Sequence, residues 1–229
     1  KYHVRDGAFI INWGAGKTPK WANEVPACKG ITLLNHWSKV NDSINKIDSF
    51  YRFQKAKVPT PAWTLSMADA IGWSKNGAWI CCRTKIEGKD GSGLVLAKKS
   101  SEVLEAKLFT QYVPIAREFR AYVFRGKHID TLEKRKKTEA LKNGEVNPDI
   151  RTESNNWVFC RSNVYPPNGI GPLAVAAIKA VGLDFGGVDI VQSKNGTLYV
   201  LETNSAPGIG GKSVELFRDE ILNLYKEAA

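Results

Sequence analysis

Short apolar runs and stretches of helical spacing divide this chain of 229 residues into elements. Apolar runs of four to eight residues that are bounded by glycine, asparagine or charged residues predict strands. Arg125-Gly126 and Asn195-Gly196 each separate two such runs, so both predict hairpin turns. We expect strands at 8–13, 31–34, 79–83, 93–97, 108–113, 118–124, 127–133, 187–192 and 197–203.

Apolar residues three and four positions apart predict helices in other parts of the chain. The first helix is expected at 41–57, and it should end before Val58-Pro59 because the residue preceding a proline is excluded from the α region. A second helix is expected at 172–181, where Gly182 suits a left-handed cap. A third, amphipathic helix is expected at 214–228.

Antiparallel strand pairs mixed with helices indicate an α+β fold. The polar stretch 138–156 contains Asn-Gly and Asn-Pro pairs and predicts a loop. Hydrophobic residues make up 43% of the chain and charged residues 24%, as in ordinary globular proteins. No apolar run approaches the ~20 residues that span a bilayer, and the N-terminus lacks the layout of a secretory signal. We therefore expect a cytoplasmic protein without a membrane partner.

The net charge of +10 favours anionic partners, which include nucleotide phosphates, an acidic substrate and nucleic acid. The basic run at 134–137 suits either a solvated face or a phosphate site. Tryptophans interleaved with lysines would suit the stacking of bases, but tryptophans with apolar neighbours are more often buried. Nucleic acid is therefore not expected as a partner. The tryptophans concerned are Trp13, Trp21, Trp37 and Trp63.

The most specific chemistry lies in the C-terminal hairpin. Glu202 and Asn204 are two residues apart on one predicted strand, so their side chains point to the same side. The hairpin brings Asp189 of the neighbouring strand close to them. Such groups are costly to bury on apolar strands unless something compensates, and Mg²⁺ takes oxygen ligands together with phosphates and water. At this point the sequence is compatible with two interpretations of these residues, a magnesium site and solvent-facing positions of the hairpin.

A polar, glycine-containing segment at 85–92 lies between two predicted strands, within the sequence RTKIEGKDGSGLVL at 83–96. Gly88, Gly91 and Gly93 allow the backbone to approach a ligand closely, and its amides can cradle phosphate oxygens. Arg83 ends a strand beside this segment and is a candidate phosphate ligand. The segment matches neither the P-loop nor the dinucleotide-binding pattern, and a hairpin loop also uses glycines.

Taken in order, three segments resemble the ATP-grasp superfamily: WICCRTKIEGKDGSGLVL, LFTQYVPIAREFRAYV and FGGVDIVQSKNGTLYVLETNSAPG. The resemblance covers 45–211. Within the superfamily, these segments are similar to those of ligases that add glutamate to peptide ends and of bacteriophage ATP-grasp proteins. It implies an ATP-grasp fold in which two α+β subdomains, 46–113 and 114–229, grip ATP. A short N-terminal segment, 1–45, would stand in place of the full α/β domain that most relatives carry.

The resemblance also implies roles for individual residues. Backbone groups of Tyr112 and Val113 would contact adenine, and Glu118 would bind the ribose hydroxyls. The implied magnesium ligands are Asp189, Glu202 and Asn204. The implied nucleotide-binding residues are Lys46, Arg83, Gly88, Gly91, Gly93, Gln111, Tyr112, Val113, Glu118 and Lys136. The implied contacts to the transferred phosphate and the substrate are Arg120, Arg135, Arg151, Arg161 and Asn163.

By the same resemblance the chain would be an ATP- and Mg²⁺-dependent carboxylate-amine ligase that forms an acyl phosphate and releases ADP and phosphate. Its substrates would be small-molecule or peptide carboxylates and amines, and a protein partner would replace the reduced N-terminal domain. In D-alanine–D-alanine ligase an arginine precedes the metal-binding aspartate by two positions, where this chain has Gly187. The alternatives are a regulatory nucleotide-binding module without ligase activity and a basic nucleic-acid-binding protein. A phage-encoded protein would act in the host cytoplasm.

Overall fold

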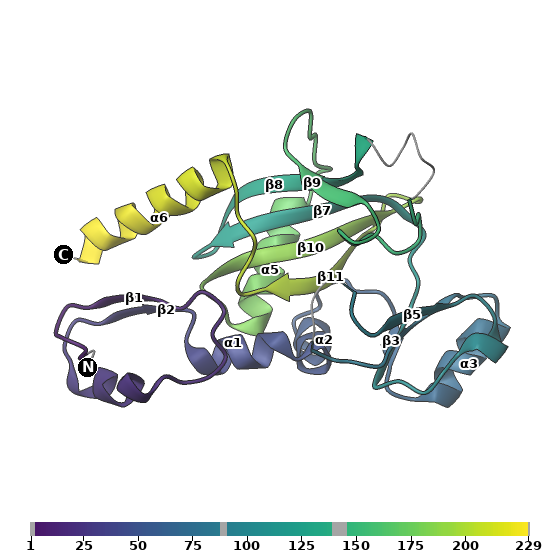
Figure 1. The fold of residues 1–229 in the computed structure, drawn as a ribbon, viewed down its shortest axis with the longest axis horizontal. Helices are drawn as coiled ribbons and strands as arrows, with labels where there is room; N and C mark the ends of the chain where they lie inside the picture. Colours follow the sequence, from purple (N-terminus) through teal and green to yellow (C-terminus); the bar gives the residue numbers. More distant parts are fainter. Residues whose placement is uncertain (1–2, 88–90, 139–145, 229) are drawn as a thin grey trace.

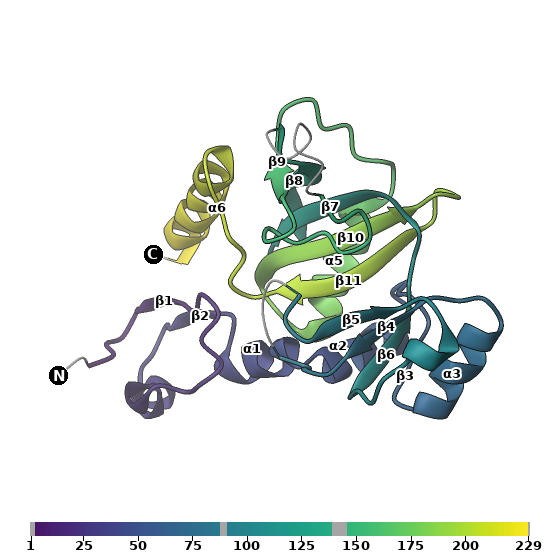
Figure 2. The same ribbon diagram turned by 45° about the vertical axis from the view of Figure 1, so that its right-hand side comes forward.

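The structure is a computed structural model that describes residues 3–87, 91–138 and 146–228. A five-stranded sheet occupies the centre, a four-stranded sheet lies beside it, and a two-stranded sheet lies near the N-terminus (Figure 1). The two ends of the chain lie on the same side of the molecule, as Figure 2 also shows. No helix within these residues is long and apolar enough to cross a membrane.

The five-stranded sheet is antiparallel, with the order β11-β10-β7-β8-β9. Helix α5 (Ile170–Val181) packs on one face, where Phe119, Val188 and Ile190 join it in the core. Side chains alternate along each strand, so the opposite face carries the polar residues. The strands are Leu198–Asn204 (β11), Phe185–Ser193 (β10), Ile115–Phe124 (β7), Lys127–Lys136 (β8) and Trp157–Cys160 (β9).

The four-stranded sheet has the order β3-β6-β4-β5 and is covered by α3 (Met67–Lys75) and the short 3-10 helix η2 (Ser100–Glu102). Cys82 and Phe109 are buried on the α3 side. Arg83, the next residue after Cys82, therefore points to the other face. The strands are Trp63–Thr64 (β3), Leu108–Gln111 (β6), Ile80–Arg83 (β4) and Leu94–Ala97 (β5).

The N-terminal residues form a parallel strand pair, β1 (Phe9–Ile11) and β2 (Thr32–Leu34), connected through the 3-10 helix η1 (Lys20–Ala27). The buried Asn35 joins this segment to the start of β10. Its backbone N–H donates to Asp184 Oδ2 at 2.6 Å, and its side-chain oxygen accepts the backbone N–H of Asp184 at 2.8 Å. The N-terminal segment is thus bonded to the central sheet.

Helix α6 (Lys212–Ala228) is attached to the same sheet by aromatic packing. The buried ring of Phe217 lies 5.5 Å from Trp13 and 6.1 Å from Phe185. Trp13 in turn lies 4.9 Å from Phe185. One aromatic cluster therefore connects the N-terminal segment, β10 and the C-terminal helix.

The tryptophans considered for base stacking pack against other aromatic rings. Trp37 is 5% exposed, and its ring lies 5.5 Å from that of Trp21. Trp63 lies 4.8 Å from Tyr51 in an edge-on arrangement. These contacts agree with the expectation that such tryptophans belong to packed clusters.

The helix predicted at 41–57 is wrong as a single element. The structure has α1 (Trp37–Ile44) and α2 (Lys46–Lys55), which are separated by Asn45. Asn45 adopts an extended backbone with ψ 113°, and its side-chain oxygen accepts the N–H of Ile47 at 2.9 Å. The apolar periodicity runs through both helices, whereas the asparagine side chain caps α2 and breaks the continuity.

The other two predicted helices are confirmed as α5 and α6, and Gly182 ends α5 with φ +75°. Helix α3 and strand β9 were missed. The signal for α3 was Ser66, whose side chain accepts the N–H of Asp69 at 3.2 Å. Strand β9 begins directly after the predicted loop, of which residues 139–145 lie outside the described part.

Candidate active site

The acidic residues of the C-terminal hairpin lie on the face of the central sheet opposite α5. Asp189 on β10 is paired with Glu202 on β11, and Asn204 is paired with Gly187. Val188 points into the α5 core, so Asp189 points away from it. The hairpin geometry expected from the sequence is therefore present.

Asp189 is buried and forms an ion pair with Arg120 of the neighbouring strand β7. Arg120 donates from Nε to Asp189 Oδ1 at 2.7 Å and from Nη2 to Oδ2 at 2.8 Å. Burial alone would raise the pKa of Asp189, but the Arg120 guanidinium outweighs it and lowers that pKa below its ordinary value. Asp189 is therefore held in its charged form.

The side chain of Arg120 also covers Gly187. A Cβ atom on Gly187 would lie 3.4 Å from Arg120 Cδ and 3.0 Å from Pro207 Cβ. An arginine at position 187 would thus compete for the space that Arg120 occupies. In this chain the cation beside Asp189 comes from β7 instead.

Glu202 has a cation partner as well. Lys46, the first residue of α2, places its Nζ 3.2 Å from Glu202 Oε2. The side chain of Lys46 is 15% exposed. Both candidate metal-binding carboxylates are therefore paired with basic side chains from other elements.

A further ion pair lies on the same face. Lys134 on β8 places its Nζ 2.5 Å from Glu118 Oε1 and donates to the backbone oxygen of Arg151 at 2.8 Å. Burial raises the pKa of Glu118, and Lys134 opposes that rise. The sequence analysis did not single out Lys134 from its basic run. The predicted hairpin between β7 and β8 could have identified Lys134 as a partner of Glu118, because it sets these two strands side by side.

Arg135 lies on the opposite face of the sheet. Its Nη2 donates to Glu133 Oε2 at 2.7 Å and to the backbone oxygen of Asn163 at 2.7 Å. Glu133 is paired with Phe119, which belongs to the α5 core. The structure therefore does not bring Arg135 or Asn163 to the acidic residues.

Arg161 is engaged in a network that reaches α6. It donates to both oxygens of Asp130, at 2.7 and 2.5 Å, and to Ser213 Oγ at 2.6 Å. Ser213 lies in the first turn of α6 and is fully buried. Asp130 is paired with Tyr122, whose hydroxyl donates to the backbone oxygen of Gly208 at 2.6 Å. Arg161 therefore holds the start of α6 against β8.

The backbone of the glycine-containing segment approaches neighbouring side chains closely. Gly91 has φ +72°, and a Cβ there would lie 2.9 Å from Thr152 Cγ2. Gly93 has φ +74°, and a Cβ there would lie 2.9 Å from Thr84 Oγ1. Both positions require glycine. Arg83 Nε is buried and has no hydrogen-bond partner within the described residues, while Gly88 lies outside them.

The predicted adenine-contacting segment packs against the start of β4. The ring of Tyr112 stacks on Trp79 at 5.5 Å, and its backbone N–H donates to the Trp79 oxygen at 2.8 Å. The backbone N–H of Gln111 donates to Ala62 at 2.8 Å. Burial and the nearby Asp149 raise the pKa of Tyr112 to about 12. The N–H of Tyr112 is therefore engaged within the protein, whereas Val113 follows it in the connection to β7.

The side chains of Arg151 and Lys136 both lie close to the ring of Trp157. The Arg151 guanidinium lies 4.4 Å from the centre of Trp157, and Lys136 Nζ lies 5.8 Å from it. Arg151 also donates to the backbone oxygen of Ile115 at 2.8 Å. Burial lowers the pKa of Arg151. Trp157 belongs to β9, at the opposite edge of the sheet from β11, whereas Ile115 belongs to β7 beside β10.

Residues 81–219 match a family model described as a RimK-like ATP-grasp domain. The chain belongs to the RimK-like ATP-grasp family. Among curated proteins it is similar to a probable alpha-L-glutamate ligase of Parasynechococcus marenigrum, with 29% identity over 198 residues that cover 80% of this chain and 40% of that protein. A probable alpha-L-glutamate ligase of Coxiella burnetii is 35% identical over 130 residues, or 55% of this chain and 42% of that protein. The chain spans about two fifths of the length of these relatives.

Solved structures show the same fold. D-alanine–D-alanine ligase from Bacillus anthracis in complex with ATP has a TM-score of 0.64 and 15% identity, covering 96% of this chain and 81% of that one. The ATP-grasp ligase PsnB in complex with a minimal precursor has a TM-score of 0.60 and 19% identity, covering 90% and 65%. The expected ATP-grasp fold and the kinship with glutamate-adding ligases are confirmed.

Proposed function

We propose that this RimK-like ATP-grasp protein is an ATP-dependent ligase that joins a carboxylate to an amine through an acyl phosphate. The observation that carries the proposal is the gathering of Asp189, Glu202 and Asn204 on one sheet face, with Arg120 and Lys46 in contact with the two carboxylates. Charges in this arrangement indicate a binding role, because burying each of them costs desolvation free energy.

The donor set suits Mg²⁺. Asp189, Glu202 and Asn204 offer carboxylate and amide oxygens, which a hard cation prefers. Asn204 Nδ2 is buried without a hydrogen-bond partner of good geometry in the described part of the chain, and the Asn204 amide also helps to lower the pKa of Asp189. Within the same residues, no group of three or more histidine, cysteine, aspartate or glutamate side chains is placed to hold a metal ion. An ion bound to this set would neutralise charge on the ATP phosphates.

The ion pairs of the site suggest a way in which the basic residues would bind the phosphates of ATP. Arg120 and Lys46 neutralise the carboxylates in the protein alone. When the carboxylates take up a cation, both basic side chains need new anionic partners, since a buried charge without a partner is strongly unfavourable. The ATP phosphates supply those partners. The same side chains thus pass from carboxylate to phosphate as the nucleotide binds.

In the proposed reaction, the substrate carboxylate attacks the γ-phosphorus and ADP leaves. The amine then attacks the acyl carbon, and phosphate leaves from the tetrahedral intermediate. The chain's task is to position the reactants and stabilise negative charge. Arg120 and Lys134 are the basic groups whose charges lower the pKa of Asp189, and we assign them to that purpose. The segment that includes Gly91 and Gly93 would exclude water, which hydrolyses an acyl phosphate.

The names of the relatives define the substrates to be tested. Curated relatives are named probable alpha-L-glutamate ligases, and PsnB has been solved with a precursor peptide. We therefore propose amino-acid and peptide substrates, with glutamate as the first amine to test.

The proposal is tested by product formation. Purified protein with Mg-ATP, glutamate and a panel of peptides should release ADP and phosphate and increase the mass of the accepted peptide by one residue. Glu202→Gln should reduce ADP release by at least about 10²-fold, as expected for the loss of preorganised charge stabilisation. Lys226→Gln, a change in the last turn of α6, is the matched control and should leave ADP release unchanged. Nucleotide binding without ADP release for any substrate would favour the regulatory module.

A further inference from the structure

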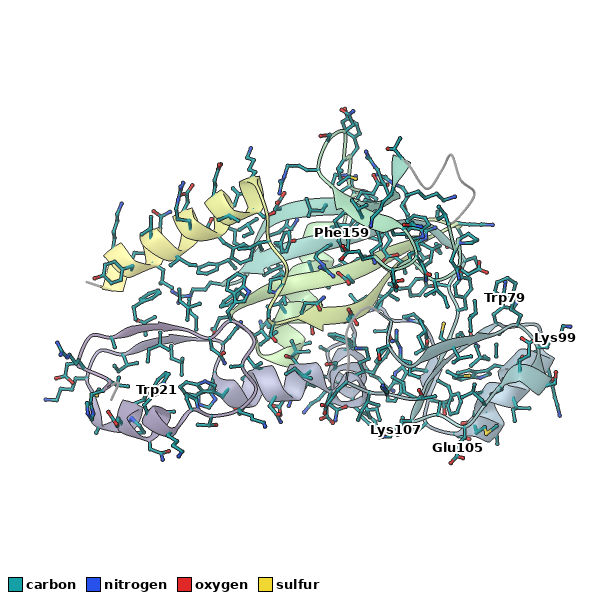
Figure 3. The ribbon with its side chains drawn as sticks, viewed as in Figure 1. Trp21, Trp79, Lys99, Glu105, Lys107 and Phe159 are labelled. Carbon is teal, nitrogen blue, oxygen red and sulfur yellow. The ribbon has the colours of Figure 1, made fainter. Side chains whose placement is uncertain are left out.

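Two aromatic side chains of β9 each lie beneath two basic residues. The Arg120 guanidinium lies 4.3 Å from the centre of the Phe159 ring, and Lys134 Nζ lies 4.9 Å from it. Two residues earlier on the strand, Trp157 lies beneath Arg151 and Lys136. We call Trp157 and Phe159 the aromatic strip of β9. In Figure 3 the label of Phe159 lies over the strands of the central sheet.

Strand geometry explains why the strip lies on the functional face. Phe159 is paired with Lys134, and Trp157 is paired with Lys136, so each ring shares a face with its lysine. Arg120 lies on β7, which is separated from β9 by β8. The ring of Phe159 therefore extends across β8 to reach the guanidinium that binds Asp189.

An aromatic ring suits cations that must change partners. The face of the ring attracts a cation electrostatically, yet it brings no negative charge that competes with a phosphate. Arg120 and Lys134 are each paired with a carboxylate, Asp189 and Glu118 respectively. If Asp189 binds a metal ion, Arg120 loses that partner but keeps its contact with Phe159.

We propose that Phe159 is a positioning residue that holds Arg120 and Lys134 toward the γ-phosphate of ATP. This inference rests on the proposed function and adds a residue to it that has no ionisable group. The ring contacts Arg120, the partner of Asp189, and not Trp79, which stacks on Tyr112 of the predicted adenine-contacting segment, so we assign it to the transferred phosphate. Phe159 should therefore increase the affinity for ATP and not the affinity for ADP.

The test compares two nucleotides by titration calorimetry. Phe159→Leu should weaken the binding of the non-hydrolysable β,γ-imido analogue of ATP with Mg²⁺ by about 3- to 30-fold, the range expected for cation-π contacts. Binding of Mg-ADP should change by less than about 2-fold, because the γ-phosphate is missing. Phe159→Tyr retains the ring and should restore the analogue to within about 2-fold of the wild type.

Two further variants separate positioning from packing. Val158→Ala alters the same strand on the opposite face, where Val158 is paired with Arg135, and should leave both affinities unchanged. Phe159→Met is a second variant without a ring, for use if the leucine variant does not fold.

If Phe159→Leu weakened the binding of both nucleotides equally, or if Phe159→Tyr bound the analogue as weakly as Phe159→Leu, this inference would be overturned. The proposed function would not be affected by either result. A wild-type protein that binds neither nucleotide would overturn the proposed function and this inference with it.

Discussion

At the residue scale, the site consists of charges that are buried in pairs. The Arg120–Asp189 pair is bidentate, and its side chains are only 18% and 8% exposed. Both groups have lost most of their hydration, so the pair is stable only while both members are present. The stability that it provides is present above the ordinary pKa of a carboxyl group and is lost as the pH falls through the lowered pKa of Asp189.

Removal of one member of this buried pair should therefore lower the free energy of unfolding far more than removal of one member of an exposed pair. Arg120→Ala leaves Asp189 buried and unpaired and should lower the free energy of unfolding by about 3–5 kcal/mol. Adding Asp189→Asn to that variant should recover part of the loss. Urea denaturation of the three proteins measures both effects.

Arg52→Ala is the matched control for this prediction. Arg52 pairs with Asp42 at the same 2.7 Å, but the side chains are 35% and 31% exposed. Arg52→Ala should lower the free energy of unfolding by less than about 1 kcal/mol, because solvent screens an accessible ion pair. Equal losses for Arg52→Ala and Arg120→Ala would show that burial does not govern the Arg120–Asp189 pair.

At the element scale, helix α6 is fixed at its first turn by side chains from the central sheet. Arg161 on the segment after β9 binds both Asp130 on β8 and Ser213 on α6. The loop between β11 and α6 is fixed in addition by Tyr122, through Gly208. This loop follows Asn204 directly, so the position of α6 affects the end of the acidic hairpin.

Arg161→Ala should loosen this attachment. Asp130 and Ser213 would lose a shared donor in a buried setting, which should cost about 1–3 kcal/mol. Hydrogen exchange followed by mass spectrometry should show faster exchange at 205–216. Arg218→Ala, on the exposed side of the same helix, should leave exchange there unchanged. Unchanged exchange in Arg161→Ala, together with lost ADP release, would instead favour a direct catalytic role.

At the scale of the whole molecule, the site brings together elements from distant parts of the chain. Lys46 begins α2, whereas Glu202 lies in the C-terminal hairpin. Arg83 ends β4 in the four-stranded sheet, and Lys98, which follows β5 of that sheet, pairs with Asp149 at 2.7 Å. Under the proposed function, metal and nucleotide would act on the same set of ion pairs, Arg120–Asp189 and Lys46–Glu202.

This arrangement predicts that Mg²⁺ and nucleotide bind cooperatively. Mg²⁺ alone must displace Arg120 and Lys46 without offering them new partners, so 5 mM Mg²⁺ should barely change the melting temperature. Mg²⁺ with ADP at about 100 times its Kd should raise it by roughly 5–10 °C, which corresponds to about 2.7 kcal/mol. Scanning calorimetry with Mg²⁺, ADP and both together measures the difference. An equal shift with Mg²⁺ alone would contradict the ion-pair exchange.

The local sequence determined the elements that carry the chemistry. Alternating apolar residues around Asn195-Gly196 predicted the hairpin, and its period of two placed Glu202 and Asn204 on one side. Gly182 predicted the end of α5 in the same way. These features depend on residues a few positions apart, and turn and strand preferences act at that range.

Only the tertiary structure decided which charges meet. Sequence analysis treated Arg120 and Arg135 alike, but the strands place them on opposite faces. It assigned Lys46 to the nucleotide without its contact to Glu202, and it gave no role to Phe159. Such contacts depend on the register between strands and on packing between distant segments, because a charge is buried only where the folded chain supplies its partner.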